Sequence, residues 1–227
     1  MASEDLPSTI DTVLKITGKE KLQYIGWSQG ALIMFALLSE KPEYNKKVSC
    51  FRNWAYSLIA RSRNDRMGLA RQASAVVIPS RLCTSVLPCL GTQHTIRYRV
   101  SRLAVYFSHA PAGASINNAL HLAQLVRCNC FEMFDYGITK NIAKYGKPKP
   151  PGYTLSRAEV PVAIYWSKGD WFAAEQDVAH LQKELTNVVE YYQVPEEKFT
   201  HFDFGWGINA EPILYRKMMS VMEGFRT

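Results

Sequence analysis

The chain has 227 residues, of which 47% are hydrophobic and 12% aromatic, so it can bury one substantial core, and we expect one domain. No apolar run approaches the roughly 20 residues that a membrane-spanning helix needs, which argues against a transmembrane segment. The N-terminal stretch MASEDLPSTI is acidic and polar, whereas a signal peptide would be basic and then apolar, so we expect no signal peptide in the sequence as given.

The net charge of +7 comes from one segment of the chain, residues 52–102. This segment holds nine arginines, no lysine and a single acid, Asp65, and the remainder of the chain is close to neutral. A basic segment with interleaved aromatic residues could bind the phosphates of a nucleic acid, and an anionic lipid surface is an alternative partner. Because the segment carries no recognised nucleic-acid module, we interpret it as the solvated face of helical connectors and expect no nucleic-acid partner. The arginines are Arg52, Arg61, Arg63, Arg66, Arg71, Arg81, Arg97, Arg99 and Arg102.

Alternating helical and strand patterns predict an α/β fold in which a long segment interrupts the regular elements. Prolines cut this segment, residues 57–158, repeatedly, and its tail over residues 145–152 is typical of an extended linker. The strand that begins at Lys47 is expected to end early, because Arg52 and Asn53 interrupt it. The predicted elements are a helix that Asp5 or Ser8 caps and Gly18 ends, strand 22–25, helix 29–39, strand 47–51, strand 160–166, helix 175–185, strand 188–194 and helix 212–225.

The pentapeptide Gly26-Trp27-Ser28-Gln29-Gly30 lies between a predicted strand and the apolar helix that follows it. A serine at such a sharp turn has its hydroxyl exposed above the sheet, and the flanking glycines give the turn its room and its dihedral freedom. The pattern alone is weak, but this placement makes it a candidate nucleophile elbow with Ser28 as the nucleophile. The backbone N–H of Gln29 would then supply one oxyanion donor.

A serine nucleophile needs a histidine base and an orienting carboxylate, which in hydrolases with this elbow follow in the order serine, acid, histidine. Asp170 comes just beyond the end of one predicted strand, and His201 lies in the loop after the next. Asp203 is so close to His201 that we expect it to order the loop. The other candidates fit less well, because they lie inside a predicted helix or in the long insertion: Asp177, His180, His94, His109 and His121.

The five cysteines give no sign of a metal site. Cys128-Asn129-Cys130 is a lone C-x-C pair with no companion pair or histidine cluster at zinc spacing. We therefore predict neither a bound metal nor another cofactor.

Several short segments together resemble the acid lipases of the gastric and lysosomal type, over residues 5 to 50 and from about residue 82 to the end. The resemblance implies an α/β-hydrolase fold whose core comprises residues 1–56 and 159–227, with a helical cap over residues 57–158. The family's catalytic triad matches Ser28, Asp170 and His201. The segments that carry the resemblance are Asp5-Leu6-Pro7, Gly26-Trp27-Ser28-Gln29-Gly30, Ser101-Arg102-Leu103-Ala104-Val105-Tyr106, Ser108-His109-Ala110-Pro111-Ala112-Gly113, Gly169-Asp170-Trp171 and His201-Phe202-Asp203-Phe204.

The resemblance also implies a function: hydrolysis of neutral lipid esters, such as triacylglycerols or cholesteryl esters, at a lipid–water interface, in a lysosome or a secreted fluid. The apolar walls for the acyl chains would come from Phe107, Leu120, Leu122 and residues 131–136 of the cap.

The sequence departs from the family at Trp27, where the family usually has histidine, and over residues 52–80. We expect the family's first strands, its signal peptide and the loop with the second oxyanion donor to be missing from the sequence as given. We therefore keep a catalytically weak or inactive lipid-binding protein as the alternative function.

Overall fold

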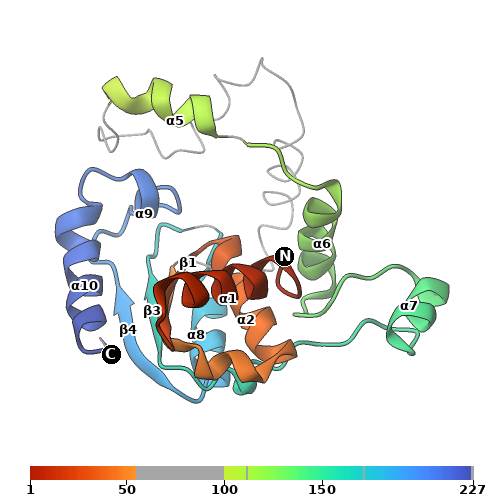
Figure 1. The fold of residues 1–227 in the computed structure, drawn as a ribbon. Coiled ribbons are helices and arrows are strands. Elements are labelled where there is room, and N and C mark those ends of the chain that lie inside the picture. The colour runs from red at the N-terminus through yellow and green to blue at the C-terminus, as the bar shows by residue number, and fades with distance from the viewer. Residues whose placement is uncertain (55–99, 111, 171, 226–227) are drawn as a thin grey trace.

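The computed structural model describes residues 1–54, 100–110, 112–170 and 172–225, and its central element is a parallel β-sheet (Figure 1). Four strands pair in the order β1-β2-β3-β4, and every neighbouring pair is parallel. Parallel strands place their carboxyl ends at one edge of the sheet, where ligands and catalytic groups of α/β proteins gather. The strands are β1 Leu22–Trp27, β2 Val48–Trp54, β3 Val162–Trp166 and β4 Val188–Gln193.

The prediction that Arg52 and Asn53 would end the second strand early was wrong. Strand β2 continues to Trp54, because both of its edges are paired: Arg52 lies in register with Ile25 of β1 and with Ala163 of β3. The ladders on the two sides satisfy the backbone groups and override the polarity of the side chains. Arg52 and Asn53 are both buried, and burial lowers the pKa of the Arg52 guanidinium.

Helices connect the strands, as the alternating pattern predicted. The predicted terminal helix over residues 212–225 is in fact a π-helical turn, η4, followed by α10, and the other predicted core helices agree with the structure within about one residue. The helices are α1 Asp5–Thr17, α2 Gln29–Glu40, α5 Leu103–His109, α6 Ile116–Cys128, α7 Ile138–Tyr145, α8 Glu175–Glu184, α9 Asp203–Trp206 and α10 Arg216–Glu223, with the short turns η1 Pro42–Lys46, η2 Val100–Arg102, η3 Leu155–Arg157 and η4 Glu211–Tyr215.

Helices α2 and α10 pack on opposite faces of the sheet. The side chains of consecutive strand residues point to opposite faces of the sheet. The contacts of Gln23 and Tyr24 in β1 therefore show what packs on each face. Tyr24 packs against Phe51 of β2, and the Phe51 ring lies 4.7 Å from that of Phe35 in α2. Gln23 instead donates a hydrogen bond of 3.1 Å to the carbonyl of Met222 in α10. The sheet is therefore the middle layer of an α/β/α arrangement, which confirms the predicted fold class.

The described part of the predicted cap contains α5, α6 and α7, which lie along the upper and right-hand sides of Figure 1, beyond the sheet. The tail that we predicted to be an extended linker is hydrogen-bonded to the segment between α6 and α7, residues 129–137: Met133 N–H donates to Pro151 O at 2.9 Å. The boundaries of the cap stay a prediction. The arginines from Arg61 to Arg99 lie outside the described residues. Among the residues that are described, no helix is both long enough and apolar enough to span a membrane.

Candidate active site

The turn between β1 and α2 has the backbone of a nucleophile elbow. Ser28 has φ 54° and ψ −122°, a conformation that a residue with a side chain rarely adopts. Strain of this kind at a strand-to-helix turn is typical of a serine whose hydroxyl is exposed at the top of a hydrolase sheet. Gln29 begins α2, where the N–H groups of the first turn have no acceptor within the helix, so its N–H is suited to bind a developing oxyanion.

The first glycine of the pentapeptide, Gly26, is required for a steric reason. A Cβ atom on Gly26 would lie 2.7 Å from the backbone nitrogen of Ala31 and 2.8 Å from its Cα, so only glycine lets strand and helix approach so closely. Gly30 has more room, because the atom nearest to a Cβ added there is the Tyr24 hydroxyl oxygen at 3.7 Å. That hydroxyl donates a 2.9 Å hydrogen bond to the Gly30 carbonyl, and burial raises the pKa of Tyr24 to about 12.

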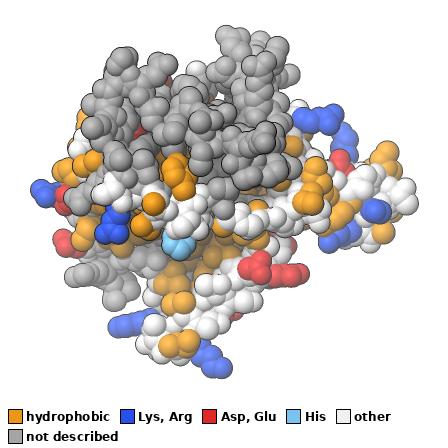
Figure 2. Space-filling model, turned by 90° about the horizontal axis from the view of Figure 1, so that it is seen from above, with side chains coloured by type: hydrophobic (Ala, Val, Ile, Leu, Met, Phe, Trp, Pro, Cys, Tyr) orange, Lys and Arg blue, Asp and Glu red, His pale blue; other side chains and the backbone are white. Residues whose placement is uncertain are grey.

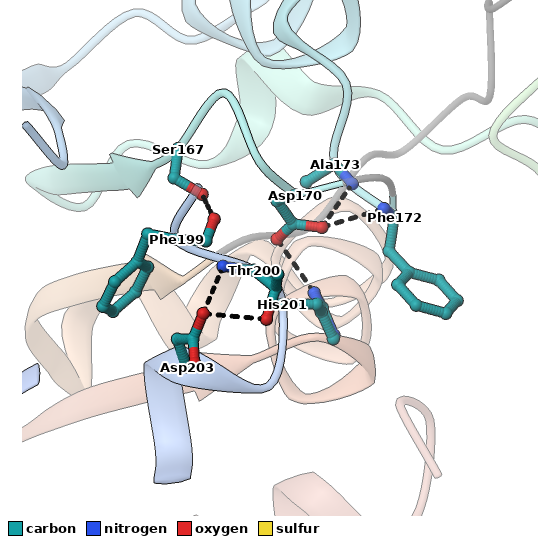
Figure 3. Close-up of polar contacts among 8 residues, drawn as sticks. All are labelled: Ser167, Asp170, Phe172, Ala173, Phe199, Thr200, His201 and Asp203. Atoms are coloured by element: carbon teal, nitrogen blue, oxygen red, sulfur yellow. Dashed lines mark hydrogen bonds and ion pairs between the residues drawn. The ribbon is translucent and has the colours of Figure 1, made fainter. Parts of the chain in front are cut away.

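His201 and Asp170 form the hydrogen-bonded pair at the same edge of the sheet (Figure 3). His201 Nδ1 lies 2.9 Å from Asp170 Oδ2, and both side chains are buried. The other carboxylate oxygen, Oδ1, accepts the backbone N–H groups of Phe172 at 2.8 Å and Ala173 at 3.1 Å. These bonds fix the carboxylate, which in turn selects the His201 tautomer that leaves Nε2 free to act as a base.

Hydrogen bonds around this pair tie the loop after β4 to the loop after β3. Ser167 Oγ donates to the Phe199 carbonyl at 2.6 Å, just before the segment that carries His201. Asp203 Oδ2 accepts the N–H of Thr200 at 2.6 Å and its hydroxyl at 2.9 Å (Figure 3). Asp203 thus orders the loop, as predicted, while the carboxylate that contacts His201 belongs to Asp170.

Aromatic rings enclose the His201 imidazole. The centroid of the Trp27 ring lies 5.6 Å from that of His201, and the Phe172 ring lies 4.9 Å away. Trp27, where the sequence departs from the family, thus has its ring beside the candidate base. No local pattern in the sequence signals this contact, since it depends on how the loop after β4 folds over the elbow.

The structure brings the three predicted triad residues to one edge of the sheet, because Ser28 follows β1, Asp170 follows β3 and His201 follows β4. Within the described residues, no hydrogen bond joins the Ser28 hydroxyl to His201, so that contact stays a prediction. Catalytic hydrogen bonds are often long in structures without substrate. A second contact that sequence reasoning missed is the hydrogen bond from Gln29 Nε2 to Asn118 Oδ1 of α6.

The remaining titratable candidates lie elsewhere. His180 and Asp177 are in α8, and His121 of α6 hydrogen-bonds the Glu132 carbonyl through Nε2. His109 ends α5, and His94 lies outside the described residues.

One group of possible metal ligands occurs in the described part of the chain, Cys128, Cys130 and Glu132, whose ligand atoms lie within 4.8 Å of one another. The two cysteines form a disulfide, and disulfide sulfurs are not the thiolates that bind metals. We therefore assign no metal to this group.

The chain is similar in sequence to known lipases. The chain is 32% identical over 253 residues to a gastric triacylglycerol lipase from Bos taurus, an alignment that covers 98% of this chain and 63% of the relative. It is 33% identical over 258 residues to the human lysosomal acid lipase/cholesteryl ester hydrolase, covering 100% and 63%. The chain thus spans somewhat less than two thirds of the length of these relatives. No protein-family model matches it.

Solved structures agree with the fold. An epoxide hydrolase from Bacillus megaterium superposes with a TM-score of 0.54 at 11% identity, over 95% of this chain and 74% of that one. An esterase from Exiguobacterium antarcticum superposes with a TM-score of 0.57 at 15% identity, over 95% and 72%. At such low identity these likenesses establish the fold alone. The chain has the α/β-hydrolase fold and is similar in sequence to the gastric and lysosomal acid lipases.

Proposed function

We propose that the protein is a serine ester hydrolase, a lipase that cleaves neutral lipid esters through Ser28, His201 and Asp170. The observation that carries the proposal is the buried 2.9 Å hydrogen bond between His201 Nδ1 and Asp170 Oδ2, at the sheet edge where the elbow presents Ser28. A histidine held in this way can act as the base that activates a serine, and the strained elbow supplies that serine.

The reaction follows from these positions. His201 Nε2 accepts the proton of the Ser28 hydroxyl as Oγ attacks the ester carbonyl carbon, and Asp170 stabilises the imidazolium that forms. The Gln29 N–H binds the oxyanion, and one such donor contributes about 3 kcal/mol to transition-state stabilisation. The imidazolium then protonates the departing alcohol. Water, deprotonated by His201, attacks the acyl-enzyme, and Ser28 regains its proton as the carboxylic acid leaves.

Apolar surface near the site supports a neutral lipid substrate. Phe172, whose ring contacts His201, is 39% exposed. The face seen from above in Figure 2 shows hydrophobic side chains around a histidine. Relatives named for gastric and lysosomal lipases support the same substrate class and an acidic lysosome or a secreted fluid as the place of action.

A second candidate is a hydrolase-like protein that binds lipid with little or no turnover. The observation in its favour is the lack of a hydrogen bond between Ser28 and His201 in the described structure. Reactivity of Ser28 distinguishes the two candidates, because only an activated serine attacks a neutral phosphonate ester at a useful rate.

The experiment is to express residues 1–227, incubate the protein with an alkyl organophosphonate ester and map the adduct by mass spectrometry. We expect the adduct on Ser28 and none in Ser28→Ala. An adduct on another serine would reassign the nucleophile, and an unreactive Ser28 would favour the second candidate. Hydrolysis of an emulsified triglyceride against a soluble short-chain ester then tests the substrate class.

A further inference from the structure

We propose that Asn118 of the cap helix α6 is a positioning residue, which docks the cap on the elbow and holds the oxyanion donor in place. The inference rests on the proposed function. Its structural basis is one hydrogen bond: Gln29 Nε2 donates to Asn118 Oδ1 at 2.5 Å, between residues that are 89 positions apart in the chain. Both side chains are half-buried, so solvent competes only in part for this bond.

The position of Gln29 gives the bond its importance. Gln29 directly follows Ser28 and is the first residue of α2, so its backbone carries the proposed oxyanion donor and its side chain leaves the same short turn. A side chain anchored at its amide leaves the backbone fewer orientations. Oxyanion donors depend on such preorganisation, since a donor that must reorient during the reaction loses much of its effect.

Among the described residues, the contacts of helix α6 come from its inner face and from Gln124, which exchanges two hydrogen bonds with Asp135. Asn118, His121 and Leu125 recur at helical spacing and form its inner face: His121 binds the Glu132 carbonyl, and Leu125 is buried. Ile116 and Leu120, by contrast, are 77% and 50% exposed. Among the described residues, Leu125 and the segment 129–137 hold the C-terminal part of α6, and Asn118 anchors its N-terminal part through a hydrogen bond.

In the part of the cap that the structure describes, the hydrogen bond between the Gln29 and Asn118 amides couples the cap to the catalytic turn. When α6 is docked, Asn118 restrains Gln29; when the bond breaks, the N-terminal part of α6 and the Gln29 turn both gain freedom. Asn118 itself needs no contact with substrate for this role.

The chain offers a matched control in Asn117, the exposed neighbour of Asn118 on the same helix. Asn117→Ala and Asn118→Ala change the helix propensity alike, so any difference between them comes from the contact with Gln29. Asn118→Asp keeps an acceptor for Gln29 Nε2 and is the conservative variant.

Two readouts test the proposal. The first is hydrogen–deuterium exchange of peptides from residues 116–128, measured by mass spectrometry, which does not depend on activity. We expect exchange in Asn118→Ala to be faster by about threefold to tenfold, which corresponds to the loss of one hydrogen bond. In Asn117→Ala we expect the exchange rate to be unchanged. Equal exchange in the two alanine variants would overturn the docking role.

The second readout is the rate at which the phosphonate ester modifies Ser28. We expect a loss of about threefold to tenfold in Asn118→Ala, recovery in Asn118→Asp and no change in Asn117→Ala. Faster exchange with an unchanged rate of modification would overturn the positioning role. If Ser28 does not react at all in the chain without substitutions, the proposed function fails. The exchange measurement then still decides whether Asn118 docks the cap.

Discussion

Replacing Gly26 by alanine tests whether the elbow depends on the close approach of β1 and α2. The added Cβ would meet three backbone atoms, Ala31 N at 2.7 Å, Ala31 Cα at 2.8 Å and the Gly30 carbonyl carbon at 2.9 Å. Ordinary carbon contacts need about 3.5 Å or more, and backbone atoms cannot rotate away as a flexible side chain can. Strand and helix must therefore separate at the residue that positions Ser28.

Overpacking of this kind costs about 1–3 kcal/mol, and contact with three backbone atoms puts Gly26→Ala near 3 kcal/mol. For a chain of this length that lowers the melting temperature by about 6–12 °C. Gly30→Ala is the matched control, because its Cβ meets only the Tyr24 hydroxyl at 3.7 Å and its place in α2 favours alanine by about 0.5–1 kcal/mol.

The assay combines thermal unfolding, followed by circular dichroism, with phosphonate modification of Ser28. We expect Gly26→Ala to be less stable and poorly reactive, and Gly30→Ala to retain both stability and reactivity. The steric argument would be refuted if Gly26→Ala had the melting temperature and the reaction rate of the chain without substitutions. It would also be refuted if Gly30→Ala lost as much stability and reactivity as Gly26→Ala.

Two further predictions concern the surroundings of the site. Trp27→Ala removes the ring that lies 5.6 Å from His201, so we expect slower phosphonate modification by about tenfold, with most of the rate kept in Trp27→Phe; equal rates in the two variants would show that the ring contact is unimportant. Burial raises the pKa of Tyr24 to about 12 from its ordinary 10, so its neutral form contributes stability below pH 10 that is lost as the pH rises towards 12, up to about 2 kcal/mol. Urea unfolding at pH 9 and pH 11.5 should therefore show a smaller loss of stability in Tyr24→Phe than in the unmodified chain, and an equal loss in both would contradict this account.

Local patterns in the sequence predicted several parts of the site. The elbow is a serine between glycines at the junction of a strand pattern and a helix pattern, and Asp170 follows a short buried strand, so each could be found within a few residues. The pairing of His201 with Asp170 was inferred from chain order and from the common edge of parallel strands. The structure has this pair at 2.9 Å.

Features that depend on distant partners could not be predicted. Whether β2 continues through Arg52 depends on pairing with strands on both sides, which no short window of sequence contains. The contact of Trp27 with His201 and the bond of Gln29 to Asn118 each join segments about 90 or more residues apart. Such contacts follow from packing, and the patterns of single elements do not determine them.

The most direct test of the central claim, that Ser28, His201 and Asp170 act as one unit, is a double-mutant cycle on the rate of phosphonate attachment to Ser28. The rate is measured in the unmodified chain, His201→Ala, Asp170→Ala and the double variant, with His180→Ala of α8 as the control histidine. Residues that act as a unit are strongly non-additive. We predict that His201→Ala and Asp170→Ala each lose at least about a hundredfold, that the double variant is no slower than His201→Ala, and that His180→Ala is unchanged. Losses that multiply in the double variant, or rates that do not fall in the single variants, would contradict the account.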